Sequence, residues 1–481
     1  MKLKKILFEN LNDSQIVFKN TVWSLLNKIL SYLLRGLSII VAARFLGPSN
    51  YGIFSSVFSF CNIFRFISDF GLTTTITKNT SEHREKRTLI FFNSFILFFF
   101  ITLISFLISY FLFNFFFKPE LKLLFIIIFF GLIFDLLREI SSSFLTGLEK
   151  IEIPSILKIV TNLFLFLGVI FYLKNNPEPT TLGYIYFWIF LVGAIFGLFL
   201  VFKNINKTTL KDDTKINSEI LSYLFKDAWI FGITNVLFFI NINFTILLLS
   251  KSFDPEVVGI YSASLRFYEA LTVIPISFAS AILPTIIRRK DKINIFLEKI
   301  LKIYHLIFWP LLFGTIFLGK ELIIFIFGNS YKDAFYPFLI LIFGFLFNSY
   351  ISLFITILTA IGKRKEMLIL DILNILLILI LSFILIPKFS INGAAFVHLL
   401  NFLILFIFST ITLKKFLKFK ILPNFSKYLF TSILMALFIY FLDIFGMFLF
   451  LKIFLGIIFY FSFLYFIKDD LLNEIKNLRN Y

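Results

Sequence analysis

Five basic residues lie deep inside long apolar runs of the sequence, where a positive charge needs water or an acidic partner: Lys28, Arg35, Arg65, Arg138 and Arg266. A cation left in the middle of a bilayer costs at least about 2.5 to 3.5 kcal/mol. Guanidinium groups bind phosphate through a planar fork of N–H donors, and a dry-walled cavity strengthens that pairing. If they converge in one hydrated chamber, these side chains would bind an anionic ligand, and phosphate suits them best.

Three acidic residues stand three or four positions from one of these cations, a spacing that places both groups on one helical face: Asp69 after Arg65, Asp135 before Arg138, and Glu269 after Arg266. One interpretation is internal neutralisation without any role in ligand binding. The alternative is that the acids couple movement of the ligand to an ion. Lys28 and Arg35 are seven apart on one face of the first helix and have no acid nearby in the sequence, which favours a binding role for them.

The composition limits the class of protein that can hold these charges. Of 481 residues, 59% are hydrophobic and only 15% are charged, whereas a soluble globular chain carries roughly 25% charged residues. We therefore expect an all-α polytopic membrane protein. The formal charge of +18 then mainly sets orientation and attracts anionic lipid, not nucleic acid. The single cysteine, Cys61, rules out an internal disulfide and a CxxC pair, and we expect no metal and no other cofactor.

Apolar runs of about 20 residues, the length of a membrane-spanning helix, predict about fourteen spans. The segment 321–334 is too short to cross, and we place it at the outer surface as a partial helix. When the spans alternate, most Lys and Arg of the connections fall on one side, which is therefore cytoplasmic and holds both termini. The predicted spans are 20–46, 51–76, 89–117, 121–148, 154–173, 182–202, 222–250, 258–287, 296–318, 335–361, 366–386, 391–413, 428–445 and 447–467.

Two distant stretches share a turn motif, ARFLGPSNYGIFSSV (43–57) and SKSFDPEVVGIYSAS (250–264). Pro48 matches Pro255 and Gly52 matches Gly259, and the two copies lie six spans apart. An even separation gives both halves one orientation, related by an axis along the membrane normal. The sequence thus predicts two pseudo-symmetric six-helix lobes around a central cavity. The expected divisions are an interfacial segment 1–19, an N-lobe 20–203, a cytoplasmic linker 204–221, a C-lobe 222–416, and two C-terminal helices with a cytoplasmic tail, 417–481.

Enzyme motifs are weak in this chain. The run GTIFLGKE (314–321) mimics a phosphate-binding loop, but Glu321 replaces the required Ser or Thr and the context is an apolar span. No connection exceeds about 20 residues, which leaves no room for a folded catalytic domain. We therefore expect a transporter and not an enzyme. Gly193 and Gly197 have the GxxxG spacing that indicates close approach of two helices.

Five segments in a fixed order resemble the polysaccharide repeat-unit flippases, the O-antigen (Wzx-type) family of the multidrug/oligosaccharidyl-lipid/polysaccharide exporter superfamily. They are ARFLGPSNYGIFS after the first span, SDFGL (68–72), IIFIFGNSYKDA (323–334), LTAIGKRKEM (358–367) and LIPKFSINGAAF (385–396). The resemblance implies two six-helix lobes, two extra helices and a cationic central cavity. In that family, basic residues on the first, second and eighth helices line the cavity, and comparable places here are held by Lys28, Arg35, Arg65 and Arg266.

The resemblance also implies a function, namely transfer of an undecaprenyl-diphosphate-linked oligosaccharide from the inner to the outer leaflet of the bacterial inner membrane by alternating access. We expect a polysaccharide polymerase and a chain-length regulator as further partners. One alternative is a multidrug or cation antiporter of the same superfamily, although Lys28 and Arg35 argue against the acidic cleft that it would want. A second alternative is a membrane glycosyltransferase or polysaccharide ligase, which would need a larger outer loop and paired functional carboxylates.

Overall fold

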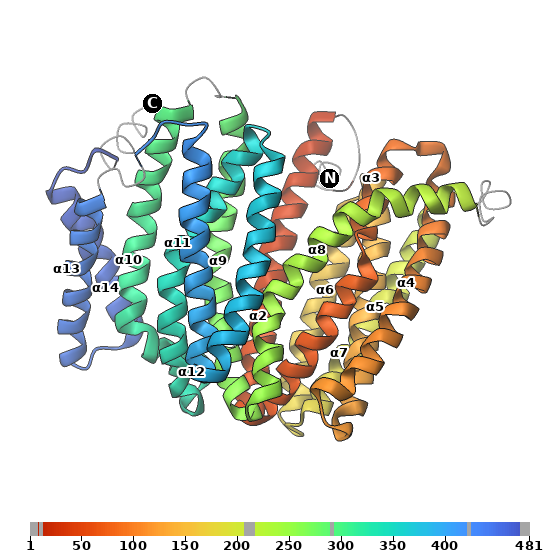
Figure 1. The fold of residues 1–481 in the computed structure, drawn as a ribbon, viewed down its shortest axis with the longest axis horizontal. Helices are drawn as coiled ribbons and strands as arrows, with labels where there is room; N and C mark the ends of the chain where they lie inside the picture. Colours follow the sequence, from red (N-terminus) through yellow and green to blue (C-terminus); the bar gives the residue numbers. More distant parts are fainter. Residues whose placement is uncertain (1–7, 9–12, 206–216, 289–292, 421–424, 472–481) are drawn as a thin grey trace. The chain divides into compact units, whose positions relative to one another are not determined.

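The computed structural model describes residue 8 and residues 13–205, 217–288, 293–420 and 425–471. Within these ranges the chain is almost entirely helical and contains no strand, which confirms the predicted all-α fold (Figure 1). The predicted interfacial segment before Asp13, most of the linker 204–221 and the end of the tail lie outside the described residues. The chain divides into two compact units, Met1–Gly259 and Ile260–Tyr481.

The helices follow the predicted spans closely, usually within a few residues at each end. Those of the first unit are α2 (Asp13–Asp69), α3 (Leu72–Glu82), α4 (Arg87–Phe116), α5 (Lys122–Gly147), α6 (Glu152–Gly168), α7 (Pro179–Asn204) and α8 (Ser218–Ser252). Helix α9 (Pro255–Arg288) begins in the first unit and continues into the second. The second unit adds α10 (Ile293–Phe327), α11 (Phe335–Ala360), α12 (Arg364–Lys414), α13 (Phe425–Ile444) and α14 (Leu449–Phe466).

Eleven helical stretches among the described residues are long and apolar enough to cross a membrane. Two helices, α2 with 57 residues and α12 with 51, are each long enough for two crossings, since about 20 residues suffice for one. Each contains one residue with non-helical backbone angles, Gly47 in α2 and Ser390 in α12. Both breaks fall where the sequence predicts a turn between two spans. The exact number of spans, fourteen, stays a prediction.

The predicted span 51–76 is wrong at its end, because the helix stops at Asp69 and a new helix, α3, starts at Leu72. Between them Phe70 and Gly71 have positive φ angles of 40° and 80°. A Cβ added to Gly71 would lie 2.5 Å from the backbone oxygen of Ala228 in α8. Helix α8 passes so close to this turn that only glycine fits at position 71.

The predicted partial helix 321–334 is also corrected. Helix α10 continues without interruption as far as Phe327, and only Asn329–Ala334 form a separate short 3-10 helix, η5. Nothing between Leu318 and Phe327 breaks a helix, since Gly319 alone costs little and packs against Phe335 and Phe338. The helix ends at Gly328, whose φ of 98° is easily reached only by glycine.

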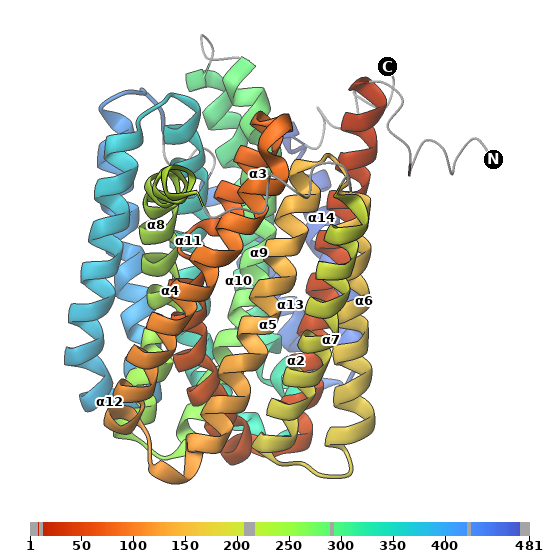
Figure 2. The same cartoon turned by 90° about the vertical axis from the view of Figure 1, so that its right-hand side faces the viewer.

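In the first unit, α5 packs along α7, and α2 packs along α6 (Figure 2). A Cβ on Gly193 would lie 3.2 Å from the Arg138 side chain, and one on Gly197 would lie 3.1 Å from Ser141. The predicted close approach at the GxxxG spacing is thus confirmed, and its partner is α5. Helix α8 runs obliquely and packs against α2, α3 and α4 within this same unit (Figure 1). The sequence assigns α8 to the C-lobe, and the predicted lobe boundaries stay predictions.

The two turn motifs that the sequence pairs, around Gly52 and Gly259, contact each other reciprocally. A Cβ on Gly52 would collide with the backbone oxygen of Pro255, and one on Gly259 would collide with the backbone oxygen of Pro48. Two copies of a motif that meet across a local two-fold axis give this kind of exchange, in which each copy contacts the other's counterpart. The contact supports the predicted repeat at this point, while the symmetry of whole lobes stays a prediction.

In the second unit, a buried lysine holds three helices together. Lys452 of α14 has a side chain only 3% exposed, and its Nζ lies 2.6 Å from Glu321 of α10 and also contacts Asp443 at the end of α13. The same three helices, α10, α13 and α14, also bury a shared apolar cluster that includes Leu306, Met435 and Tyr460. The ion pairs let a lysine occupy an otherwise apolar helix.

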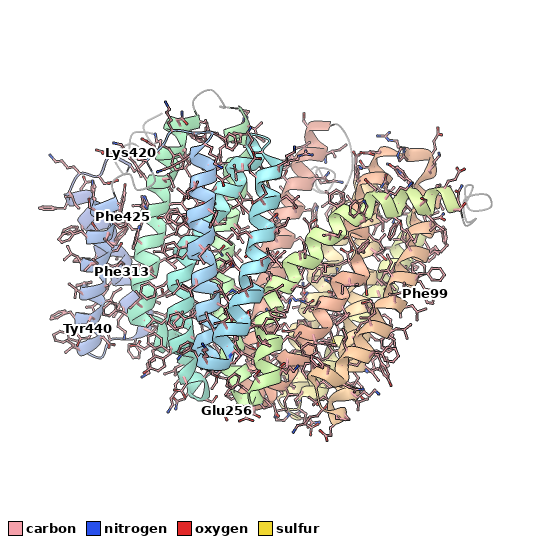
Figure 3. The ribbon with its side chains drawn as sticks, viewed as in Figure 1. Phe99, Glu256, Phe313, Lys420, Phe425 and Tyr440 are labelled. Atoms are coloured by element: carbon pink, nitrogen blue, oxygen red, sulfur yellow. The ribbon has the colours of Figure 1, made fainter. Side chains whose placement is uncertain are left out.

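Large apolar side chains cover the outer surface of both units (Figure 3). Phe99 of α4 is 59% exposed and Tyr440 of α13 is 54% exposed, and both point away from the helices behind them. Soluble monomers rarely expose apolar patches larger than a few hundred Å². These surfaces are suited to lipid, so the chain is a multi-pass membrane protein.

The contact between Gly52 and Gly259 predicts an effect on stability. Val at either position would push its branched side chain into a backbone carbonyl, so both Gly52→Val and Gly259→Val should lower the apparent melting temperature of the detergent-solubilised protein by several degrees. Gly36→Val is the control, because a Cβ there has no other atom within 4 Å. Equal melting temperatures for all three variants would contradict the close approach.

Candidate anion-binding site

Charged side chains from three helices of the first unit form one connected cluster. They are Arg35 and Arg65 of α2, Asp135, Arg138 and Glu139 of α5, and Lys158 of α6. Four cations thus share two carboxylates, which leaves a net positive charge inside a segment that is otherwise apolar. We call this set the α2–α5–α6 cluster.

Asp135 is the buried centre of the cluster, with a side chain only 1% exposed. Its Oδ1 accepts hydrogen bonds from Arg138 Nη2 at 2.6 Å and from Nε at 3.0 Å. Its Oδ2 lies 3.6 Å from Arg65 Nη2 and 3.8 Å from Arg35 Nη1. Three guanidinium groups therefore surround one carboxylate, which fixes Arg138 by hydrogen bonds and attracts Arg65 and Arg35 by charge.

Glu139 forms a second and looser centre one helical turn further along α5. Its Oε2 accepts a short hydrogen bond from Arg65. Its Oε1 lies 3.6 Å from Arg138 Nη2 and 3.8 Å from Lys158 Nζ, distances too long for hydrogen bonds. The Glu139 side chain is 29% exposed. Glu139 therefore holds its cations by charge more than by fixed geometry.

The local sequence explains why these groups meet. Asp135, Arg138 and Glu139 are three and four residues apart, so they share one face of α5. The break at Gly47 lets the two segments of α2 bring Arg35 and Arg65 to the same carboxylate oxygen. Helix α7 contributes Gly193, which leaves space for the aliphatic part of the Arg138 side chain. The guanidinium of Arg65 also lies over the Phe66 ring, at 4.7 Å, a favourable cation–π position.

A polar cavity of about 330 Å³ adjoins the cluster within the first unit. Arg138, Glu139 and Lys158 form one part of its wall, and hydroxyl and amide side chains form most of the remainder. These polar side chains are Ser24, Asn27, Thr73, Ser142, Ser143, Thr146 and Ser155. The charged cluster is therefore not sealed, and its Glu139 edge can be reached from a hydrated space.

The structure brings together three of the predicted binding residues, Arg35, Arg65 and Arg138, with the predicted coupling residue Asp135. Lys28 lies on the same helix as Arg35 and is exposed. Arg266 belongs to the second unit, where its Nη1 lies 2.7 Å from Glu269, as the three-residue spacing predicts. The roles of all these residues stay predictions.

Asp69 interacts electrostatically with Arg65, as the spacing suggests, but its hydrogen bonds go to Thr73. Its Oδ1 accepts a hydrogen bond from the backbone N–H of Thr73 at 3.1 Å, and its Oδ2 accepts one from the Thr73 hydroxyl at 3.2 Å. These bonds satisfy donors at the start of α3. Arg65 forms ion pairs with Asp135 and Glu139, which are distant in sequence.

Sequence reasoning did not select two members of the cluster, Glu139 and Lys158. Glu139 follows Asp135 by four residues and could have been found as a second acid on the same helical face. No spacing in the sequence points to Lys158, because its partner, Glu139, lies on another helix. Long-range pairs of this kind become visible only once α5 and α6 are packed.

The chain has the fold of the multidrug/oligosaccharidyl-lipid/polysaccharide transporters. It superimposes on the lipid II flippase MurJ in its inward closed conformation with a TM-score of 0.77. The sequence identity is 19%, and the match covers 94% of this chain and 100% of that one. An inward-facing multidrug resistance MATE family transporter matches with a TM-score of 0.64, at 14% identity, over 81% of this chain and 98% of that one.

Residues 17–290 match the model of the polysaccharide biosynthesis protein family, and the chain belongs to that family. It is also 24% identical over 405 residues to the "Putative O-antigen transporter" of Shigella flexneri, an alignment that covers 79% of this chain and 93% of the relative. The resemblance stated from the sequence motifs is thus confirmed.

The centre of the cluster predicts a strong coupling between Asp135 and Arg138. Removing one partner of a buried ion pair costs about 3 to 5 kcal/mol, because the other charge stays buried without compensation. Asp135→Asn should therefore sharply reduce thermal stability, and Arg138→Gln should do the same. The double variant should be less damaged than the sum of the two single variants. Strict additivity in a melting experiment would contradict this pairing.

Proposed function

We propose that this protein is a flippase that moves undecaprenyl-diphosphate-linked oligosaccharide repeat units from the inner to the outer leaflet of the bacterial inner membrane. Membership of the polysaccharide biosynthesis family, similarity to a named O-antigen transporter and a MurJ-like fold support the class of cargo. The observation that carries the proposal is the excess of cations in the α2–α5–α6 cluster, since a diphosphate needs such a partner.

The physical task explains why this cluster would matter. A sugar-diphosphate head cannot cross hydrocarbon, because each unmatched polar group costs several kcal/mol and each charge costs more. Arg35, Arg65 and Lys158 would replace water around the diphosphate, while the polyprenyl tail stays in the lipid. An interior-negative membrane potential favours outward movement of negative charge by about 2.3 kcal/mol per charge per 100 mV. Voltage alone could then supply part of the driving force.

In this proposal both termini are cytoplasmic, and the head is exposed alternately to the two sides of the membrane. Lys28 and Arg266 would contact the head at other stages of the cycle, and Asp69, Asp135 and Glu269 would serve as candidates for ion coupling. A polymerase and a chain-length regulator would use the transferred units. No step requires a bond to be made or broken, so the protein acts as a transporter.

A cation antiporter remains the second candidate, because the MATE transporters share the fold. Such a protein needs surplus acid to bind its cargo. In the α2–α5–α6 cluster the balance is reversed, with four cations against two carboxylates, and this favours an anionic ligand.

Neutralising Arg65 tests the proposal. Losing a charged contact to the ligand costs about 2 kcal/mol or more, so Arg65→Gln should lower the transport rate by roughly tenfold or more. The measurement is surface polysaccharide in a strain that lacks its own O-antigen flippase, with the amount of protein in the membrane monitored. Arg44→Gln, which removes an exposed cation from the same helix, should have little effect. Normal polysaccharide with Arg65→Gln would reject the role of the cluster.

A further inference from the structure

We propose that Glu139 is an internal stand-in for the ligand: its carboxylate occupies the cations of the cluster while the site is empty, and a phosphate group of the cargo displaces it. This inference rests on the proposed function and deepens it, since it assigns a role to a residue that the family resemblance does not reach. It also identifies the edge of the cluster at which the anion enters.

The two carboxylates of the cluster differ in how firmly hydrogen bonds hold them. Asp135 is buried and receives two direct hydrogen bonds from Arg138. Glu139 makes one short bond, to Arg65, while its contacts to Arg138 and Lys158 exceed hydrogen-bond length. Displacing Asp135 would leave the buried guanidinium groups of Arg65 and Arg138 without their central partner. Displacing Glu139 breaks one direct bond, so Glu139 is the carboxylate that can leave.

The cations around Glu139 suit a phosphate group. The two carboxylate oxygens of Glu139 face three nitrogen atoms, which are Nη2 of Arg65, Nη2 of Arg138 and Nζ of Lys158. A phosphate group offers three oxygens with the same acceptor character and can engage the guanidinium fork in the same way. Three converging donors therefore match phosphate better than they match the carboxylate that now holds them.

The Glu139 edge of the cluster is open to the polar cavity. Glu139, Arg138 and Lys158 all line the 330 Å³ polar cavity, whereas Asp135 does not. An anion in this cavity can reach Lys158, Glu139 and Arg138 directly. The cavity also gives the displaced side chain a polar place to move to, among Ser142, Ser143 and Thr146.

The test is binding of farnesyl-diphosphate-linked N-acetylglucosamine to the full chain in lipid nanodiscs at neutral pH. This probe is a diphosphate diester, so each of its two phosphates carries one negative charge under these conditions. Glu139→Gln should bind it about tenfold more tightly than the wild type, a gain of about 1.4 kcal/mol. The transport rate of the variant need not rise.

Three further variants make the result decisive. Glu139→Asp withdraws the carboxylate by one methylene and should show intermediate affinity. Glu120→Gln removes an exposed acid elsewhere and should match the wild type. Weaker or unchanged binding by Glu139→Gln would overturn this inference and make Glu139 a structural partner. Equal binding by the wild type and Arg65→Gln would instead overturn the proposed function.

Discussion

The arrangement of the first unit depends on one constraint, the cost of holding charge inside an apolar bundle. Asp135 meets this cost for three arginines at once, and its own charge is tolerable only because they surround it. The break at Gly47, the space provided by Gly193 and the shared face of α5 all serve to make this meeting possible. In the proposed function the cluster binds an anion, and Asp135 and Glu139 are the internal anions that keep the empty protein stable.

This constraint also separates two kinds of acid in the cluster. A carboxylate that is fully enclosed, such as Asp135, stabilises the fold and cannot take part in exchange without loss of the structure. A carboxylate at the edge of a polar cavity, such as Glu139, is the one that we propose to give up its partners when a phosphate group arrives. In that proposal the surplus of cations over carboxylates in the cluster is available to the ligand.

Much of the fold could be predicted from the sequence, because apolar runs and their interruptions are local signals. The breaks at Gly47 and Ser390 and the GxxxG approach all follow from single motifs, whereas the contact between the matched residues Gly52 and Gly259 appears only in the structure. The end of the second span could not be predicted, since the turn at Gly71 depends on a helix more than 150 residues away in the chain. The same limit applies to the site: the spacing points to Asp69 as a partner of Arg65, but the ion pairs that Arg65 forms with Asp135 and Glu139 depend on packing between helices.

The central claim is that the cluster recognises the charge of the head and not the lipid tail. The most direct measurement compares the affinity of the protein in nanodiscs for a short polyprenyl diphosphate sugar and for the matching uncharged polyprenol. The account predicts a strong, salt-sensitive preference for the diphosphate in the wild type, and loss of that preference in a variant with both Arg35→Gln and Arg65→Gln. Equal affinity for the two lipids in the wild type, or an unchanged preference in the variant, would contradict it.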